Sequence, residues 1–260
     1  MARWSLPSAE SIARAIVGVC AVLFCMAAYT WITLPDVRPL RRDRPATTAW
    51  MDMRADEARA AGAPVRKTQI WVGYDRIAES LKRAVMLAED AAFFSHDGVD
   101  YGEIRAAIQE GFENGELPRG ASTITQQLAK NLYLSPSRNP YRKLTELFLT
   151  RRLEAELSKR RIFELYLNVI EWGDGIWGAE AAARTYFGTS AASLSDEQAA
   201  LLAGAIINPR RYSPAHPDAR LRRRQEIILR KMGATSEQAP RGDKALAPIR
   251  AVEVLDAHGT

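Results

Sequence analysis

Apolar residues follow two different patterns along the chain. From Ala15 to Leu34, twenty consecutive residues carry no charge, which is about the length needed to cross a bilayer as a helix. From Asp75 onward, apolar residues recur instead at helical spacing, as Ile77, Leu81 and Val85 do. This pattern is typical of helices with one buried face. The chain is therefore predicted to carry one N-terminal transmembrane helix, followed by a mainly α domain.

Local start and stop signals divide the second region into helices. The first is predicted to end at Glu89 and the second to begin near Ser122. The signals for the others are Asn139-Pro140 as N-cap and first residue, Ser158 as a further N-cap, and a capping box from Ser195 to Gln198 that opens a helix ending at Asn208-Pro209. Alternation typical of strands is scarce, so a large sheet is not expected.

The same signals set the domain boundaries. Residues 1–14 form a short N-terminal segment, 15–34 the anchor, 35–68 a linker, 69–235 the main domain and 236–260 a tail rich in proline, glycine and charge. The linker carries four prolines, which favour turns. Within it we expect a short helix between Thr48 and Ala61, and no functional residues.

The apolar N-terminal segment is either a retained membrane anchor or a cleaved signal peptide, and an anchor could face either side of the membrane. A cleaved signal peptide usually has an apolar core of only ~7–15 residues, so the length favours a retained anchor. Arginines are more numerous after the segment than before it. That count predicts a cytoplasmic domain, although large domains can be exported despite flanking charge. The chemistry described below favours the outer face.

Composition narrows the class of protein without choosing a ligand. With 47% hydrophobic and 26% charged residues among 260, the chain is globular and large enough for a substantial core. A net charge of +5 is compatible with nucleic acid, an anionic membrane or a phosphorylated substrate. Both cysteines, Cys20 and Cys25, lie in the apolar segment, so the main domain uses neither disulfides nor cysteine-bound metal.

Glu89 is the first candidate for catalysis. Apolar residues surround the Glu89-Asp90 pair on both sides, and burial raises the pKa of a carboxyl group toward the range of a general base. The alternative is an ordinary glutamate on a solvated helix face. In the helix beginning near Ser122, polar residues at helical spacing share one face, and they suit a polar ligand better than solvent: Thr123, Gln126, Gln127 and Lys130. Free N–H groups around Ser122 and Thr123 are expected to hold an anion.

Basic residues gather at the start of the next helix. Arg138, Arg142 and Lys143 stand where the helix dipole disfavours positive charge, which indicates an anionic ligand. Glu146 lies four residues after Arg142. It is either the partner of Arg142 in a surface ion pair or a second carboxylate facing the reacting centre.

One glycine pattern imitates a dinucleotide site. The run from Gly173 to Gly178 satisfies GxGxxG, but the preceding segment is predicted to be a helix rather than a strand, and no βαβ unit surrounds it. The glycines are expected to form a tight loop instead.

Four motifs together resemble a known family. They are Glu89-Asp90-x-x-Phe93-x-x-His96-x-Gly98, Gly120-x-Ser122-Thr123-Ile124-Thr125-Gln126-Gln127, Arg142-Lys143-x-x-Glu146, and Lys159-x-x-Ile162-Phe163-Glu164-x-Tyr166-Leu167-Asn168. In this order they resemble the family 51 peptidoglycan glycosyltransferases over residues 66–232, and the Glu171-Trp172-Gly173-Asp174-Gly175 run resembles the monofunctional biosynthetic transglycosylases. Phe163 stands where the family usually has an aliphatic residue.

The resemblance implies a lysozyme-like helical domain that polymerises lipid II with inversion and releases undecaprenyl pyrophosphate. Glu89 would be the general base and Glu146 the second catalytic carboxylate, orienting the site or binding a divalent cation such as Mg or Mn; no organic cofactor is implied. The substrate-binding residues implied are Asp90, His96, Ser122, Thr123, Gln126, Gln127, Lys130, Arg138, Arg142, Lys143, Glu164 and Asn168.

The resemblance also sets the expected surroundings of the protein. It implies a single-pass protein of the cytoplasmic (inner) membrane with its catalytic domain on the periplasmic face. Lipid II, the growing glycan strand and the membrane are the expected partners, with cell-wall synthesis or division proteins as further candidates and no nucleic acid. No lysine has a serine three residues before it, so a penicillin-binding transpeptidase is not expected.

Two alternatives stay open at this point. A lytic muramidase on the same fold would also use carboxylates, but it would have little use for the basic cluster. A catalytically silent cell-wall partner would be expected to lack Glu89 or Glu146, and both are present.

Overall fold

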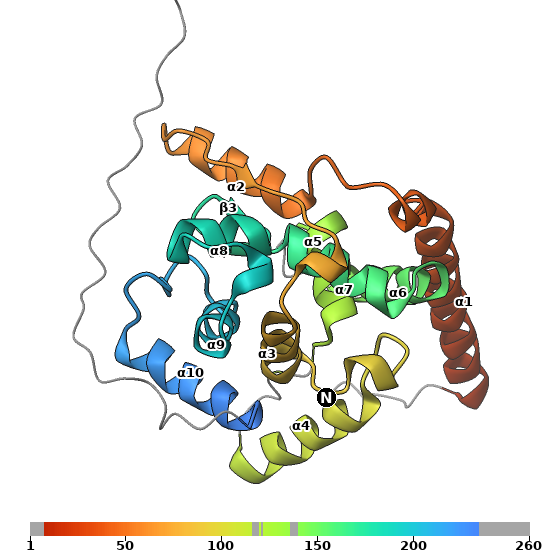
Figure 1. Cartoon of the computed structure of the whole chain (residues 1–260). Helices are drawn as coiled ribbons and strands as arrows, with labels where there is room; N and C mark the ends of the chain where they lie inside the picture. Colours follow the sequence, from red (N-terminus) through yellow and green to blue (C-terminus); the bar gives the residue numbers. More distant parts are fainter. Residues whose placement is uncertain (1–7, 116–119, 121, 136–139, 234–260) are drawn as a thin grey trace, which may run out of the picture.

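The computed structural model describes residues 8–115, 120, 122–135 and 140–233. The predicted mainly α architecture is confirmed (Figure 1). The helices are α1 (Ala9–Thr33), α2 (Ala49–Ala60), α3 (Glu79–Glu89), α4 (Tyr101–Asn114), α5 (Ile124–Tyr133), α6 (Pro140–Glu156), α7 (Lys159–Val169), α8 (Ala179–Phe187), α9 (Asp196–Ala205) and α10 (Ala219–Lys231), with short 3-10 turns at Arg38–Arg41, Tyr74–Arg76, Phe93–Ser95 and Ala191–Ser193. Asn139, Arg138 and the tail from residue 234 lie outside the described residues.

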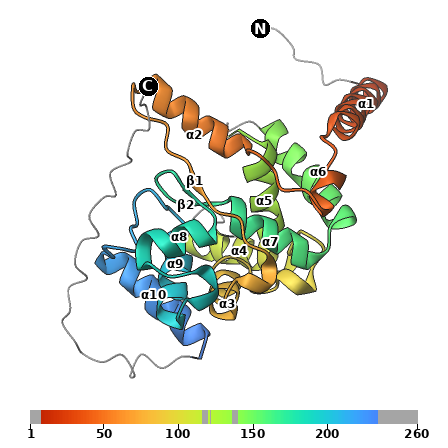
Figure 2. The same ribbon diagram turned by 45° about the horizontal axis from the view of Figure 1, so that its top comes forward.

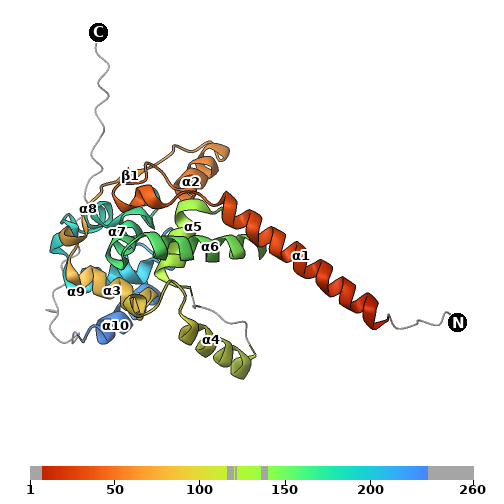
Figure 3. The same cartoon turned by 90° about the vertical axis from the view of Figure 1, so that its right-hand side faces the viewer.

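The helix α1 projects from the domain (Figure 3). It has 25 residues and is long and apolar enough to cross a membrane. Its C-terminal end packs on α6, where Thr30 donates a hydrogen bond to the Tyr141 hydroxyl (3.0 Å). Arg152 donates to the Leu34 carbonyl (3.1 Å), and its guanidinium lies 4.9 Å from the centre of the Trp31 ring. The apolar helix is therefore attached to α6 by several independent contacts.

Helix α7 forms the centre of the core. Its side chains are buried almost all round, with Ile162, Phe163, Leu165 and Leu167 fully shielded from solvent. Helices α5, α6 and α8 pack against it, and α3 packs on α9, which packs on α10 (Figure 2). Phe163, where the family usually has an aliphatic residue, contacts the ring of Phe93 at 5.4 Å between centroids. The aromatic side chain is thus accommodated by ring packing.

The capping signals of the sequence are mostly confirmed. Ser158 caps α7 by accepting from the Arg161 N–H (3.3 Å), and Ser195 and Gln198 form the predicted capping box of α9. Three helices escaped prediction: α4, α8 and α10. Two of them have an aspartate N-cap, Asp100 for α4 and Asp218 for α10, so a search for Asp caps would have found them.

A small sheet completes the domain. Its strands β1 (Thr68–Gln69), β2 (Glu171–Gly173) and β3 (Ile176–Trp177) are ordered β1-β3-β2, with β1 parallel and β2 antiparallel to β3. The GxGxxG run is the turn of the β2–β3 hairpin, where Gly175 has a φ of 71°. The expected tight loop is confirmed, because the run makes a hairpin turn between antiparallel strands rather than a nucleotide-binding turn. The segment before it is not all helix as predicted, since α7 ends at Val169 and Glu171 and Trp172 belong to strand β2.

The segment predicted to be a linker is part of the folded domain. Helix α2 occupies the expected place between Thr48 and Ala61, and it packs against α5 (Figures 1 and 2). Thr48 caps it by accepting from the Met51 N–H (3.2 Å), and Met51 is buried. Packing against α5 brings residues of α2 to the site described next.

Candidate active site

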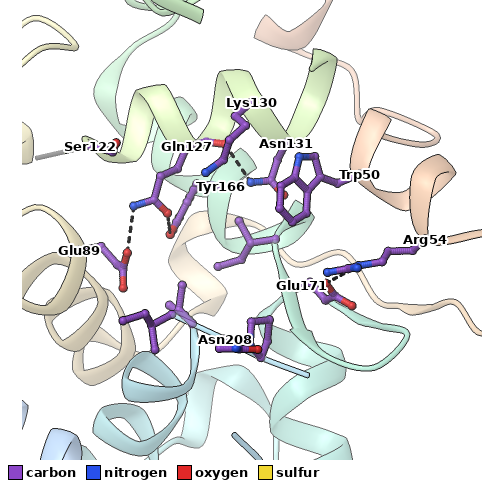
Figure 4. Close-up of a pocket in the computed structure, with 14 residues that line it drawn as sticks. Trp50, Arg54, Glu89, Ser122, Gln127, Lys130, Asn131, Tyr166, Glu171 and Asn208 are labelled. Atoms are coloured by element: carbon purple, nitrogen blue, oxygen red, sulfur yellow. Dashed lines mark hydrogen bonds and ion pairs between the residues drawn. The ribbon is translucent and has the colours of Figure 1, made fainter. Parts of the chain in front are cut away.

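A cleft of about 380 Å³ opens between α5 and the loop that follows α9 (Figure 4). Ligand pockets begin at about this size. Its lining residues come from six parts of the fold and are Trp50, Arg54, Glu89, Ser122, Gln127, Lys130, Asn131, Tyr166, Ile170, Glu171, Ile206, Ile207, Asn208 and Pro209. In Figure 4, Glu89 lies at one end of the cleft, and Arg54 with Glu171 lies at the other.

Glu89 is the last residue of α3 and places its carboxylate at one end of the cleft. Gln127 donates a hydrogen bond from Nε2 to Glu89 Oε2 (2.9 Å), and the Tyr166 hydroxyl donates to Gln127 Oε1 (2.9 Å). Tyr166 is fully buried, so this chain of hydrogen bonds has its origin in the core. It fixes the Gln127 amide, and through it the orientation of the carboxylate.

Burial raises the pKa of Glu89, which confirms the expectation from its apolar neighbours. The hydrogen bond from Gln127 and the charges of Arg224 and Lys130 oppose the rise, but they do not cancel it. A buried carboxylate with a raised pKa is a candidate proton acceptor near neutral pH.

Lys130 follows Gln127 by one helical turn and is the cation of the cleft. Burial lowers its pKa, and the negative charge of Glu146 opposes that effect. Asn131 completes this wall by donating to the Gln127 carbonyl (2.9 Å). Lys130 and Glu89 thus line the same cleft, and they supply a positive and a negative charge at different positions in it.

Glu146 is not among the residues that line the cleft. It is buried, and it pairs with Arg142 (3.3 Å between Nη1 and Oε2) and with Lys143. The structure shows the ion pair with Arg142 of the first reading, but Glu146 is buried and not at the surface. Its part in catalysis stays a prediction. Glu146 can still hold Arg142 and Lys143 in position, and its charge is felt at Lys130. Arg138 lies outside the described residues.

The carboxylates do not form a metal cage in the described part of the chain, where no three histidine, cysteine or acidic side chains cluster. Glu146 has both carboxylate oxygens in ion pairs with basic groups, whereas Mg²⁺ needs several oxygen ligands. These residues alone do not fit a divalent cation. The cation stays a prediction from the resemblance, and no step below depends on it.

Asp90 and His96 hold the site together from behind. Asp90 accepts hydrogen bonds from His96 Nε2 (3.0 Å) and from the Ile124 N–H (2.9 Å), and its side chain is only 4% exposed. His96 accepts from the Gly98 N–H through Nδ1 (3.1 Å). The pair joins the end of α3 to the start of α5, so it sets the distance between Glu89 and Gln127. Asp90 does not line the cleft, but it lines a neighbouring cavity of about 250 Å³ together with Glu89 and Ser122.

At the start of α5, three of the N–H groups near the expected anion site already have protein partners, and the anion site itself stays a prediction. Thr123 N–H donates to Gln126 Oε1 (3.1 Å), Gln126 N–H donates to Thr123 Oγ1 (3.2 Å), and Ile124 N–H donates to Asp90. Thr123 and Gln126 are buried in this capping box. Of the predicted polar face, Ser122, Gln127 and Lys130 reach the cleft.

Glu164 and Asn168 also lie away from the cleft. Asn168 is fully buried, with its Nδ2 donating to the Val72 carbonyl (2.9 Å) and its Oδ1 accepting from the Val72 N–H (2.9 Å). Glu164 accepts from the Tyr74 N–H (3.1 Å) and pairs with Arg161. Both residues fasten the segment before α3 to α7, which explains their presence in a motif without contact to a ligand.

Six polar or aromatic residues of the cleft were not among the expected site residues: Trp50, Arg54, Asn131, Tyr166, Glu171 and Asn208. Trp50 and Arg54 of α2 line the cleft, although they lie in the segment that was expected to hold no functional residues. Glu171 is buried, and Arg54 Nε donates to its Oε2 (3.0 Å). In the sequence, the only sign that α2 contributes to the cleft was the presence of Trp50 and Arg54 in the predicted short helix.

The helical fold and a cleft that contains a partly buried carboxylate and a partly buried lysine define a class of enzyme that handles polar, anionic substrates. The family model described as Transglycosylase matches residues 57–233, and the chain belongs to this family. Its relatives named biosynthetic peptidoglycan transglycosylase include one from Laribacter hongkongensis, 44% identical over 215 residues, which are 83% of this chain and 94% of the relative. One from Dechloromonas aromatica is 48% identical over 73% of this chain and 82% of the relative, and one from Methylobacillus flagellatus is 55% identical over 62% and 71%.

Proposed function

We propose that this protein is a peptidoglycan glycosyltransferase, which polymerises lipid II into β-1,4-linked glycan strands and releases undecaprenyl pyrophosphate. The observation that carries the proposal is the buried carboxylate of Glu89 in the cleft, oriented by Gln127 and facing the same space as Lys130. Membership of the transglycosylase family and the names of the relatives support it.

In this reaction Glu89 accepts the proton of the 4-hydroxyl of the acceptor GlcNAc. The hydroxyl oxygen attacks the anomeric carbon of the donor MurNAc, and the bond from that carbon to the pyrophosphate oxygen breaks. One displacement inverts the anomeric carbon and needs no covalent enzyme intermediate. The raised pKa of Glu89 favours this proton transfer, because a general base works best with a pKa near the operating pH.

Negative charge builds up on the departing pyrophosphate, and the basic residues stabilise that charge. Lys130 lies in the cleft, and Arg142 and Lys143 are held by Glu146 at the start of α6. Fixed cations in a partly buried site stabilise such charge more than they would in water. We assign Glu146 to positioning these cations and include Arg138 in the same role from the resemblance.

Two other functions are less well supported. A muramidase on this fold would use a carboxyl group to protonate a sugar leaving group, but it would have little use for the cations at Lys130, Arg142 and Lys143. A silent cell-wall partner would have no need of Glu89 in a position where burial makes its ionised form unfavourable. It would also have no need of Gln127 as a hydrogen-bond donor to that carboxylate.

The decisive experiment is lipid II polymerisation by the full chain in detergent. The product should be a glycan polymer that muramidase cuts to disaccharide units. The Glu89→Gln variant should bind lipid II but form no polymer. If the folded wild-type protein binds lipid II without extending it, the proposed activity is refuted.

The proposal includes location in the cytoplasmic membrane, with α1 as an uncleaved anchor and residues 35–260 on the outer face. The length and apolar character of α1, which is almost entirely exposed, support it. A reporter that works only after export, fused after Thr260, should be active, and N-terminal sequencing should find α1 retained. Activity of a cytoplasmic reporter alone would support the opposite orientation and contradict a lipid II substrate on the outer face.

A further inference from the structure

A second cavity adjoins the cleft and has no role in the chemistry described so far. It has a volume of about 290 Å³ and lies between α2, the segment leading to β1, and the β2–β3 hairpin. Arg54 and Glu171 line both spaces. The two cavities therefore meet at this ion pair, at the end of the cleft that lies away from Glu89 (Figure 4).

The charged residues of the second cavity form one continuous chain of alternating sign. It runs from Glu171 to Arg54 (3.0 Å), from Arg54 to Glu57 (2.8 Å), from Glu57 to Arg210 (3.2 Å), from Arg210 to Asp174 (3.6 Å) and from Asp174 to Arg66 (3.8 Å). These three arginines and three carboxylates balance, so the lining has no net charge.

This balance decides the class of ligand. A pyrophosphate or another anion is drawn to an excess of positive charge, which this cavity does not offer. Sugar hydroxyls both donate and accept hydrogen bonds, and guanidinium groups alternating with carboxylates offer the two complementary functions in turn. An uncharged saccharide therefore fits the lining better than an anion does.

An unpaired polar atom lies at the junction of the two spaces. Glu171 Oε2 accepts from Arg54, but Glu171 Oε1 is buried and has no hydrogen-bond partner. The side chain is only 4% exposed, and a buried acceptor without a partner costs free energy. A hydroxyl or amide donor of a ligand that passes from one cavity to the other would satisfy it.

We propose that the second cavity is a saccharide subsite, which holds a sugar ring of the growing glycan strand at a distance from the reacting atoms. The inference rests on the proposed polymerisation, since a strand that is lengthened in the cleft must extend beyond it. The Arg54–Glu171 pair marks the passage. The subsite gives helix α2 a role in binding, although most of α2 precedes the region matched by the family model.

The test uses the full chain in detergent and lipid-free GlcNAc–MurNAc oligomers of increasing length, with affinity measured by calorimetry. Asp174→Asn and Arg210→Gln alter the second cavity only, and both side chains are well exposed, at 63% and 47%. In the wild type, affinity should rise once the oligomer is long enough to enter the second cavity. In both variants that gain should fall about tenfold, which corresponds to ~1.4 kcal/mol. Arg222→Gln on the exposed face of α10 is the control.

Polymer length gives the second readout. Both variants should make shorter strands, whereas binding of the disaccharide and thermal stability should stay near the wild-type values. The inference is overturned if the variants bind every oligomer as the wild type does, or if inorganic pyrophosphate binding falls in place of saccharide binding. A wild type that binds long oligomers but does not polymerise lipid II would refute the proposed function and leave the subsite standing.

Discussion

Replacing Glu89 by Gln separates catalysis from folding better than any other change in this chain. The amide keeps the size of the side chain, and its oxygen can still accept the hydrogen bond that Gln127 donates (2.9 Å in the wild type). What it loses is the ability to take a proton. General bases contribute ~100-fold to ~10,000-fold, so the polymerisation rate should fall by at least ~100-fold, while lipid II affinity changes by a few-fold at most.

Stability should move in the opposite direction. Burial raises the pKa of Glu89 above the ordinary value of 4.5, so the folded state binds its proton more tightly than the unfolded state does. That preference stabilises the fold at low pH, and it is lost as the pH rises through the folded-state pKa. Near neutral pH the ionised carboxylate therefore costs stability. Glu89→Gln should unfold at the same temperature as the wild type or a higher one.

Three measurements test this reasoning together: initial polymerisation rate against pH, lipid II binding, and thermal unfolding at neutral pH. The wild-type rate should rise with pH through an inflection above 4.5, the ordinary pKa of a glutamate carboxyl group, because the base acts in its ionised form. The variant should lack the inflection. A residual rate above about a tenth of wild type would refute the assignment, and so would a rate loss that only follows lost stability.

Two further changes probe the surroundings of Glu89, and a third probes the attachment of α1. Tyr166→Phe removes the donor to Gln127, a hydrogen bond worth ~1 kcal/mol; kcat should fall about fivefold at constant KM, and an unchanged kcat would show that the carboxylate does not need this support. Lys130→Ala should cost ~10-fold to ~100-fold in rate with little loss of stability, because burial already disfavours its charge; an equal loss in Arg222→Ala would identify general surface charge as the cause. Arg152→Gln removes a donor to carbonyls at the end of α1 and should speed hydrogen exchange there; unchanged exchange would contradict the proposed attachment of α1 to α6.

The sequence predicted best those features that depend on neighbouring residues. Helix caps are local, so Ser158 and the Ser195–Gln198 box could be identified from residues three positions apart. The buried environment of Glu89 was also encoded locally, in the apolar residues on either side of it. Helix α4 was not predicted, although its N-cap, Asp100, is a local signal of the same kind as Ser158.

Residue roles inside the motifs could not be predicted in the same way. Gln127 and Gln126 are adjacent and chemically identical, yet one faces Glu89 and the other closes a capping box. Asn168 resembles a ligand-binding amide in sequence, but its polar atoms serve the backbone of Val72, almost a hundred residues earlier. Such partners depend on the packing of α5 and α7 with distant segments, which spacing along the chain does not contain.

The ionised carboxylate of Glu89 is unfavourable in its partly buried position, and buried hydrogen bonds behind the cleft hold it there. Glu89 lies at the end of α3, where burial makes its ionised form less favourable than it would be in water. The groups that fix it are themselves anchored: Gln127 by the fully buried Tyr166, and the adjacent Asp90 by His96 and the first N–H of α5. A carboxylate free to rotate could turn toward solvent and recover its hydration, which would lower its pKa again. The buried hydrogen bonds behind the cleft therefore serve catalysis directly, because they maintain the environment that makes Glu89 basic.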